Sequence, residues 1–438
     1  MKKYYLLTFG CQMNMRDSEL IAGQLEALGY ERTTDQSCAD LILALTCCVR
    51  GSAEDRALGR ISQLKPLKRD NPRLVIGVGG CMPQNPDSLK RLQEACPHVD
   101  FFFGTRNLSE LPRLLEEGRR DDKAVVDVTP RDDECIEKIT PVRQSAISAW
   151  VTISYGCNNY CSYCIVPYVR GPERSRKPEH VLEEVRRLAS QGYKEVTFLG
   201  QNVNSYGKDL PGDWSFPRLL REANEIEGIE RIRFVTSHPK DVSSELIEAM
   251  ATLNKVCEHL HLPLQSGSDR ILASMNRGYT MARYLEIVDE LRLRVPGIAL
   301  TTDIIVGFPG ESEEDFAMTM DAVQRVRFDG IFTFIYSPRP GTKAASFPGQ
   351  VPKEVKKDRL QTLVATQNRI TLELNQALVG KDVEVLVEGP SDKDPSVLAG
   401  RTRTNKVVTF PGDRALFGSL AMVRIKKARL WSLKGELR

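Results

Sequence analysis

The chain has 438 residues, of which 41% are hydrophobic and 27% charged. This allows about two to four domains with ordinary buried cores and excludes a chain that is disordered over most of its length. No stretch approaches the roughly 18 uninterrupted apolar residues of a membrane span, and the start lacks the apolar region of a secretory signal, so we expect a cytoplasmic protein without membrane contact. Lys and Arg number 61 against 58 Asp and Glu, and the formal charge of +3 is too near balance to indicate a nucleic-acid partner by itself.

Residues 1–118 predict a parallel α/β domain. Strand patterns occupy YYLLTFGCQ, ADLILALTCCVR and RLVIGVGGCMPQ, an amphipathic helix is expected over 17–28, and further helical patterns lie between the strands. A cysteine follows each strand. Because the carboxyl ends of parallel strands share one edge of a sheet, Cys11, one of Cys47 and Cys48, and Cys81 are expected to converge there.

Residues 119–142 are rich in Asp, Arg and Pro and are expected to form a linker. Residues 143–371 then hold strand-like segments that are mostly separated by helical patterns such as PEHVLEEVRRLASQG. The segments are WVTISYG, EVTFLGQN, IRFVTSHP, HLHLPLQSG, IALTTDIIVGFPG and GIFTFIYSPRPG. Six such units in this length predict a full or partial (β/α)6 barrel.

A helical stretch, KEVKKDRLQTLVATQNRITLELNQALVG, leads into the final segment, residues 372–438. Closely spaced β-type runs divided by Gly, Pro and Asp predict a small antiparallel β-barrel there. The segment holds twelve basic and eight acidic residues, and the last fifteen residues hold six basic and one acidic. This edge could bind nucleic acid, although a solvated face is the commoner explanation of a charge run. RNA binding stays open on these grounds.

The eleven cysteines are too sparse for a disulfide scaffold, and their number is odd. Three of them, Cys157, Cys161 and Cys164, form C-x3-C-x2-C directly after a strand and a glycine, so one loop can wrap a metal centre. A structural zinc site usually takes four ligands from paired C-x2-C units, and no second pair lies nearby. A [4Fe–4S] cluster held by three cysteines keeps one iron open for a substrate, which suits chemistry better than scaffolding.

This triplet, with the aromatic Tyr163 before its last cysteine and a barrel strand before its first, resembles the signature of radical S-adenosylmethionine enzymes. The resemblance implies that the open iron chelates the amino and carboxylate groups of S-adenosylmethionine. Electron transfer then splits the cofactor to a 5′-deoxyadenosyl radical, while the protein orients and shields the chemistry.

The resemblance extends along nearly the whole chain to the methylthiotransferase family. TFGCQMN, LTCCVR and VGGCMPQ are similar to the three-cysteine pattern of its amino-terminal domain, which carries a second [4Fe–4S] cluster, and the last barrel occupies the place of its RNA-binding TRAM domain. The tRNA-modifying MiaB branch is resembled most, through SYGCNNYCSYCIVPYVRGPERSR, LGQNVNSYG, IRFVTSHP, HLPLQSGSDRIL, TDIIVGFPGE and YSPRPGT. That branch converts N6-isopentenyladenosine beside the anticodon, at tRNA position 37, into its 2-methylthio derivative.

The resemblance implies six catalytic, metal-ligating cysteines. Cys157, Cys161 and Cys164 would hold the cluster that binds S-adenosylmethionine, and Cys11, Cys47 and Cys81 the cluster that carries or donates sulfur. The chain departs from the family at Leu-Thr-Cys-Cys, where Asn-Thr-Cys-Ser is usual, and at Pro83, where a small residue is usual. We assign Cys47, because it keeps the family spacing to Thr46 and Arg50 and because adjacent strand residues point to opposite faces, so that Cys48 faces the core.

Polar residues at the carboxyl ends of the predicted barrel strands are candidate cofactor contacts. With Tyr163, they are Gly200, Gln201, Asn202, Ser237, Gln265 and Asp303. His259 and His261 share a strand face, where they either line the barrel or have a structural role.

Several basic and aromatic side chains have more than one possible role. Arg170, Arg174 and Arg176 could bind RNA phosphate, the cofactor carboxylate or a neighbouring acid, and for Trp431 and Phe410 core packing is favoured over base stacking.

Related branches of the family modify threonylcarbamoyl adenosine or a ribosomal-protein aspartate, but LGQNVNSYG and TSHP favour the isopentenyl-adenosine branch. A rival of another class is a non-catalytic, metal-stabilised RNA-binding protein, which leaves the cysteines of the first domain unexplained. The resemblance implies tRNA, through its anticodon stem-loop, as a partner. It also implies an electron-donor protein such as flavodoxin or ferredoxin, and an iron–sulfur carrier. We expect a monomer.

Overall fold

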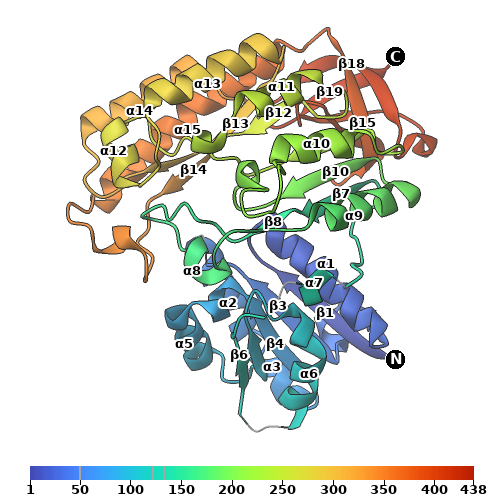
Figure 1. Cartoon of the computed structure of the whole chain (residues 1–438). Helices are drawn as coiled ribbons and strands as arrows, with labels where there is room; N and C mark the ends of the chain where they lie inside the picture. Colours follow the sequence, from blue (N-terminus) through green and yellow to red (C-terminus); the bar gives the residue numbers. More distant parts are fainter. Residues whose placement is uncertain (49–50, 121–122, 132–133, 138) are drawn as a thin grey trace.

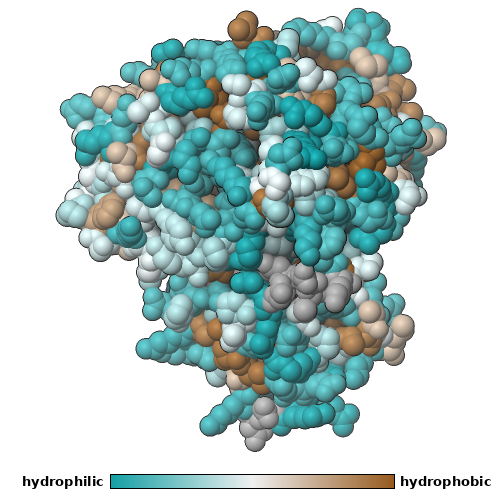
Figure 2. Space-filling view, viewed as in Figure 1, coloured by the Kyte–Doolittle hydropathy of each residue, from teal (hydrophilic) through white to brown (hydrophobic). Residues whose placement is uncertain are grey.

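A computed structural model describes residues 1–48, 51–120, 123–131, 134–137 and 139–438. The chain forms three successive units (Figure 1): an N-terminal sheet flanked by helices, a central unit of strands and helices, and a small C-terminal barrel. None of the described helices is both long and apolar enough to cross a membrane. Figure 2 shows a mostly hydrophilic surface on one face, with apolar side chains in small separate groups.

The N-terminal unit is built on a six-stranded parallel sheet. In spatial order its strands are β2 (Tyr30–Arg32), β1 (Lys2–Thr8), β3 (Leu41–Thr46), β4 (Val75–Gly80), β5 (Phe101–Phe103) and β6 (Val125–Asp127). Alternate strand residues pack on α1 (Gln12–Ala27) and α6 (Leu111–Arg120) on one face, and on α2 (Gly51–Ser62) and α5 (Pro86–Ala95) on the other. Helices cover both faces, which is why these strands read as continuous apolar runs. Shorter helices are α3 (Lys65–Asp70), α4 (Cys81–Gln84) and α7 (Glu134–Glu137).

The three strands predicted in this unit are confirmed as β1, β3 and β4, but three others were not foreseen. Each of these has only three residues, too few to show a periodic pattern. One of them, β6, lies inside the segment 119–142 that was predicted as a linker, and it pairs with β5 at the sheet edge. The helix predicted over 17–28 begins at Gln12 instead, with Cys11 as its N-cap residue.

The central unit confirms the predicted partial barrel of six parallel strands. They form two sheets, β11 (Arg231–Phe234), β10 (Glu195–Leu199) and β7 (Ser148–Thr152), and β12 (His259–His261), β13 (Ala299–Val306) and β14 (Gly330–Ile335). One face of these strands shares a buried core with α9 (Pro178–Ser190), α10 (Phe216–Asn224), α11 (Ser244–Thr252), α13 (Met281–Arg294), α14 (Glu313–Val326) and α15 (Lys353–Gln376). Smaller elements are β8 (Ser154–Tyr155), α8 (Val166–Arg170), β9 (Arg174–Ser175) and α12 (Asp269–Ser274).

The C-terminal barrel is closed, as predicted, by five strands. In spatial order they are β15 (Asp382–Ser391), β16 (Asp394–Thr402), β17 (Val407–Phe410), β19 (Leu433–Leu437) and β18 (Leu420–Ala428). Four neighbouring pairs are antiparallel, but β17 and β19 pair in parallel, so the barrel is not antiparallel throughout. The hairpin from β18 returns β19 in the direction of β17, which closes the barrel.

Two buried arginines of β11 join this barrel to the central unit. Arg231 donates from Nη1 to the carbonyl of Arg401 at 2.6 Å, and Arg233 donates to the carbonyls of Thr402 and Arg403, both at 2.8 Å. Arg233 also pairs with the buried Glu195 at 2.7 Å. Arg231 is the first residue of β11, and on the barrel side Arg403 and Lys406 pair with Glu258 and Asp329, which directly precede β12 and β14. The C-terminal barrel therefore packs at the amino ends of these strands.

Candidate functional site

The cysteines of the N-terminal unit lie at one edge of its sheet. Cys11 follows β1, Cys47 and Cys48 follow β3, and Cys81 follows β4. The structure therefore brings the predicted trio to a common edge, and Cys47, Cys48 and Cys81 are all buried. Gly10, at φ +109°, is required there, because a Cβ on it would lie 2.4 Å from the Cβ of Cys47.

Both members of the Cys47–Cys48 pair belong to this group of thiols. A hydrogen bond with Cys47 lowers the pKa of Cys11 well below its ordinary value, against the opposing effect of burial. Interaction with the thiol of Cys48 likewise lowers the pKa of Cys81 to about 7, helped by the charge of Arg170 and opposed by burial. Cys48 packs in the buried apolar cluster, as its core assignment required, yet its Sγ also lies 3.5 Å from the carbonyl oxygen of Cys81. The choice of Cys47 as ligand stays a prediction, and Arg50, used for its spacing, lies outside the described residues.

The side-chain amide of Asn14, which was not among the predicted site residues, connects two of the cysteine loops by hydrogen bonds. Asn14 donates from Nδ2 to the carbonyl of Phe9 at 2.7 Å and to that of Thr46 at 2.9 Å, so it ties the residues before Cys11 to the residue before Cys47. Arg170 holds the other end of the amide, with Nη2 2.9 Å from Asn14 Oδ1. Only the position of Asn14 within TFGCQMN offered a signal.

The second group of thiols lies in the loop between β8 and α8. The backbone N–H of Cys164 donates to the carbonyl of Cys161 at 2.9 Å, and Arg277 Nη1 lies 3.4 Å from Cys161 Sγ. Burial, and then the charge of Cys161, raises the pKa of Cys164 to about 12, and burial raises that of Cys157. Desolvation thus favours neutral thiols in this loop, and a bound cation would reverse that preference.

The short helix α8 connects the two groups. It begins at Val166, two residues after Cys164, and ends at Arg170, beside Asn14 and Cys81. Its Val169, with the preceding Ile165, packs in the same buried cluster as Cys81. The two cysteine groups therefore lie at opposite ends of one helix.

Most of the predicted cofactor contacts share one property. Among the described residues, four of them have a buried oxygen without a hydrogen-bond partner: Gln201, Asn202, Ser237 and Gln265. Ser154 Oγ and His238 Nε2 are also buried without a hydrogen-bond partner in the described part of the chain, and both residues lie at the carboxyl ends of the strands. Gly200 has no room for a side chain there, because a Cβ on it would lie 2.4 Å from Ser154 Oγ. Buried polar atoms are nearly always paired in proteins, so this concentration fits a polar ligand such as S-adenosylmethionine.

His238, the residue after Ser237 in the segment IRFVTSHP, was not among the predicted contacts. Its Nδ1 accepts the backbone N–H of Lys240 at 3.2 Å, and burial lowers its pKa to about 2. The ring is therefore neutral with its proton on Nε2, the atom that has no partner among the described residues. A neutral donor in this place could bind a carboxylate or a carbonyl.

The other two predicted contacts are placed differently. Tyr163 packs on a buried apolar cluster that includes Phe308 and Tyr336, and burial raises its pKa well above its ordinary value. Asp303 lies inside β13 rather than at its end, with Oδ1 3.5 Å from Nε2 of His261. His259 and His261 share a face, as predicted, and each has a ring nitrogen within hydrogen-bond distance of Thr301 Oγ1.

The structure excludes some of the uses that were considered for the three arginines and the two aromatic residues. Arg170 and Arg176 are buried against acids, Asp17 for the first and Glu137 and Glu184 for the second, so they do not face RNA phosphate. Arg174 donates to the carbonyl of Pro172 at 3.0 Å. Core packing is confirmed for Phe410, which is 1% exposed. It is wrong for Trp431, which lies in the turn between β18 and β19 and is 70% exposed.

No three Cys, His, Asp or Glu side chains of the described residues are arranged to hold a single metal ion. An iron–sulfur cube sets a different requirement, because each cysteine binds a different iron and the sulfurs stand farther apart than donors around one ion. The first group supplies four thiols, three of which are the predicted ligands, the second group supplies three, and an arginine lies beside each group. This donor set fits a cube with one iron left open.

Three family models match the chain. They are the Radical SAM superfamily over residues 151–323, the Uncharacterized protein family UPF0004 over 3–104 and the TRAM domain over 376–437. Among solved structures, the chain resembles the radical S-adenosylmethionine methyltransferase TsrM from Kitasatospora setae in two states. One holds a tryptophan substrate and a SAM analog (TM-score 0.60, 15% identity, 79% of this chain and 75% of that one), and the other cobalamin and a [4Fe–4S] cluster (TM-score 0.58, 16% identity, 79% and 74%). At such identities the likeness concerns the fold.

Curated relatives match over the full length. The tRNA-2-methylthio-N(6)-dimethylallyladenosine synthase of Thermoanaerobacter sp. (strain X514) is 55% identical, over 99% of this chain and 92% of its own. That of Carboxydothermus hydrogenoformans is 53% identical, over 100% of this chain and 99% of its own. Such identity over all three units places the chain with these enzymes: it belongs to the radical S-adenosylmethionine methylthiotransferases, in the family of tRNA-2-methylthio-N(6)-dimethylallyladenosine synthases.

Proposed function

We propose that this enzyme methylthiolates N6-isopentenyladenosine, the dimethylallyladenosine of its relatives' name, in tRNA. The observation that carries the proposal is identity above half with enzymes of that name along the whole chain. The two cysteine groups joined by α8 support it, because replacing an aromatic C–H by C–S–CH3 needs both a sulfur source and a means of removing hydrogen. A merely metal-stabilised RNA-binding protein would need neither the first group nor its attachment to α8.

Two [4Fe–4S] clusters and S-adenosylmethionine are the proposed cofactors. When bound, they supply the electron, the sulfur, the methyl group and the means to remove hydrogen from the adenine ring. Cys157, Cys161 and Cys164 would hold one cluster, with Arg277 beside Cys161. Cys11, Cys47 and Cys81 would hold the other, with Arg170 at its edge.

The remaining site residues would bind and orient S-adenosylmethionine at the carboxyl ends of the strands. Their unpartnered buried oxygens can accept hydrogen bonds from its hydroxyl and amino groups. His238 Nε2 can donate one to its carboxylate. The proposed contacts are Tyr163, Gly200, Gln201, Asn202, Ser237, His238 and Gln265, and Asp303 stays a prediction.

The wider assignments are also proposals. The domain boundaries remain 1–118, 119–142, 143–371 and 372–438, although α15 runs across the last of them and β6 lies in the second segment. We place the enzyme in the cytoplasm, as a monomer that receives electrons from a flavodoxin or ferredoxin and clusters from an iron–sulfur carrier. The anticodon stem-loop would contact the C-terminal barrel, where Trp431 is exposed beside basic residues.

Mass spectrometry of tRNA nucleosides from a strain that lacks this gene tests the function. We expect the methylthio group to disappear while the isopentenyl group is retained. The gene should restore it, Cys161→Ala should not, and Cys38→Ala, which alters an exposed cysteine outside both groups, should. Nucleosides that do not change on deletion would refute the proposal and point to a protein substrate.

A further inference from the structure

One face of the sheet β12-β13-β14 points away from the helices. Leu300, Thr302 and Ile304 of β13 are buried on the helix side, so the alternate residues Thr301, Asp303 and Ile305 lie on the other face. The strand register aligns Gly330 with Thr301, Phe332 with Asp303, and Phe334 with Ile305. These residues therefore form one continuous inner face of the barrel.

Phe332 is unusual on this face because this large apolar residue is 56% exposed. The ring is nevertheless held in place, since it packs edge-to-face on His261 with centroids 5.8 Å apart. An exposed aromatic ring on the edge strand of an otherwise well-packed unit offers apolar area to a ligand. Gly330, two residues earlier on the same face, leaves open space, because a Cβ there would meet only Thr301 Cγ2, at 3.8 Å.

The face is continuous with the candidate site. Ile305, aligned with Phe334, packs against the same buried apolar cluster as Tyr163 of the cysteine loop, a cluster that includes Phe308 and Tyr336. An apolar track thus runs from the loop that holds Cys161 and Cys164 down the inner face to Phe332. Asp303 is aligned with Phe332 at the end of this track. Its carboxylate is only partly buried and lies 3.5 Å from Nε2 of His261, so its oxygens can accept a hydrogen bond from a ligand.

We propose that Phe332 binds the dimethylallyl group of the substrate nucleoside, in the space that Gly330 leaves open. This inference rests on the proposed function. The substrate carries its five-carbon apolar chain on a secondary amine whose N–H needs an acceptor, and an apolar ring next to the Asp303 carboxylate matches both features. The aligned Phe334 and Ile305 extend the apolar surface toward the reacting end. In this arrangement Asp303 serves the substrate amine rather than the cofactor.

The test uses the full-length, iron–sulfur-reconstituted enzyme and two anticodon stem-loop RNAs that differ only in the dimethylallyl group. The wild type should prefer the prenylated RNA by roughly 10- to 200-fold in Kd, the range that apolar contacts give. Phe332→Ala should remove about 10-fold or more of that preference, with the affinities for plain RNA and for S-adenosylmethionine unchanged. Phe332→Leu should restore part of it.

Two further variants keep the test sharp. Gly330→Val fills the open space without removing the ring and should weaken binding of the prenylated RNA alone. Leu293→Ala, at an 81% exposed leucine of α13, should change nothing. Equal loss of both RNAs, or loss of S-adenosylmethionine binding, in Phe332→Ala would overturn the inference. A wild-type enzyme that shows no preference and forms no methylthio product would instead overturn the proposed function.

Discussion

Arg170 and Asn14 meet through a hydrogen bond of 2.9 Å between Nη2 and Oδ1, and this contact joins the helix after the second cysteine group to the loops of the first. The same guanidinium lies 3.2 Å from Asp17 Oδ2. All three side chains are buried. Their arrangement makes the placement of Cys11 and Cys47 depend on a residue that follows Cys164 by only a few positions.

Asn14→Ala should therefore impair the first cluster and spare the second. The variant leaves the carbonyls of Phe9 and Thr46 without their donor, at a cost of about 1–3 kcal/mol each where they are buried. Iron in the reconstituted protein should fall by about half, with the electron paramagnetic resonance signal of the second cluster retained. Arg170→Lys, which keeps the charge but loses the fork, should give a smaller loss. An unchanged iron content in Asn14→Ala would contradict this role.

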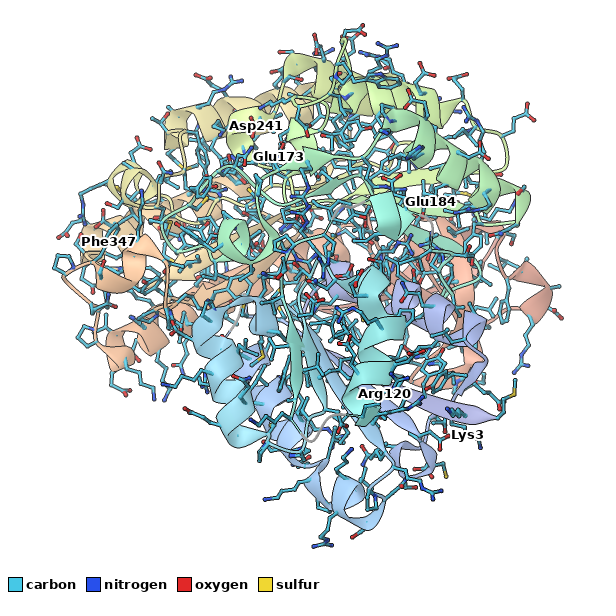
Figure 3. The ribbon with its side chains drawn as sticks, turned by 60° about the horizontal axis from the view of Figure 1, so that its bottom comes forward. Lys3, Arg120, Glu173, Glu184, Asp241 and Phe347 are labelled. Carbon is cyan, nitrogen blue, oxygen red and sulfur yellow. The ribbon has the colours of Figure 1, made fainter. Side chains whose placement is uncertain are left out.

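Glu184 of α9, labelled in Figure 3, should make the folding stability of the protein depend on pH. It is buried, and the charges of Arg16, Arg176 and Arg143 outweigh desolvation and lower its pKa from 4.5 to about 2. A carboxylate with a lowered pKa contributes stability that is present above about pH 4.5 and is lost as the pH falls toward about 2, here about 3 kcal/mol. Denaturant unfolding measured between pH 6 and pH 3 should show this loss.

Two variants of α9 separate this effect from general acid unfolding. Glu184→Gln should be less stable at pH 7 by about 3–5 kcal/mol, because three buried arginines lose their shared partner, and it should lose less on acidification. Glu183→Gln changes the neighbouring carboxylate, 72% exposed, and should match the wild type at both pH values. Equal acid sensitivity of Glu184→Gln and wild type would exclude Glu184 as the cause.

Loss of the contact between the C-terminal barrel and β11 should lower the free energy of unfolding of the barrel. Arg233→Ala removes two donors to Thr402 and Arg403 and leaves Glu195 buried without its cation, at about 3–5 kcal/mol. We expect urea unfolding to show an early transition for the small barrel. Arg424 of β18 forms a partly exposed pair with Asp382 of β15, so Arg424→Ala should cost about 0–1 kcal/mol and add no transition. A single unshifted transition in Arg233→Ala would refute the coupling.

Trp431 and Phe410 should give opposite phenotypes. Trp431→Ala removes an exposed ring and should lower affinity for the anticodon stem-loop about 10-fold, the value of one base-stacking contact, with unfolding unchanged. Phe410→Ala empties a core position and should destabilise the barrel by about 3–5 kcal/mol. RNA affinity measured at several salt concentrations checks the first prediction, and denaturant unfolding checks the second. Undiminished RNA binding by Trp431→Ala would remove it from the interface.

The fold could be predicted from the sequence wherever apolar runs are long. β1, β3, β4 and the barrel strands lie in longer apolar or alternating segments, and even the three-residue β12 lies in the alternating HLHLPL, whereas β2, β5 and β6 are short and have no such segment around them. The parallel pairing of β17 and β19 also escaped prediction, because it depends on barrel closure rather than on any local residue pattern.

The convergence of the first cysteine group followed from a general rule of parallel sheets, and the spacing of the second was visible in one loop. What the sequence could not give is contact between distant side chains. Three features depend on how distant parts of the chain pack: the hydrogen bond of Arg170 with Asn14, the contact of Cys48 with Cys81, and the exposure of Trp431. The unpartnered Nε2 of His238 likewise became visible only once its neighbours were known.

Mössbauer spectroscopy of the protein reconstituted with iron and sulfide counts the clusters and identifies their type. We expect two [4Fe–4S] clusters in the wild type and in Cys48→Ala. We expect one cluster in Cys47→Ala, and one in a variant with Cys157, Cys161 and Cys164 all replaced by Ala. A single cluster in the active wild type, or iron that is not in [4Fe–4S] cubes, would refute the assignment of two clusters.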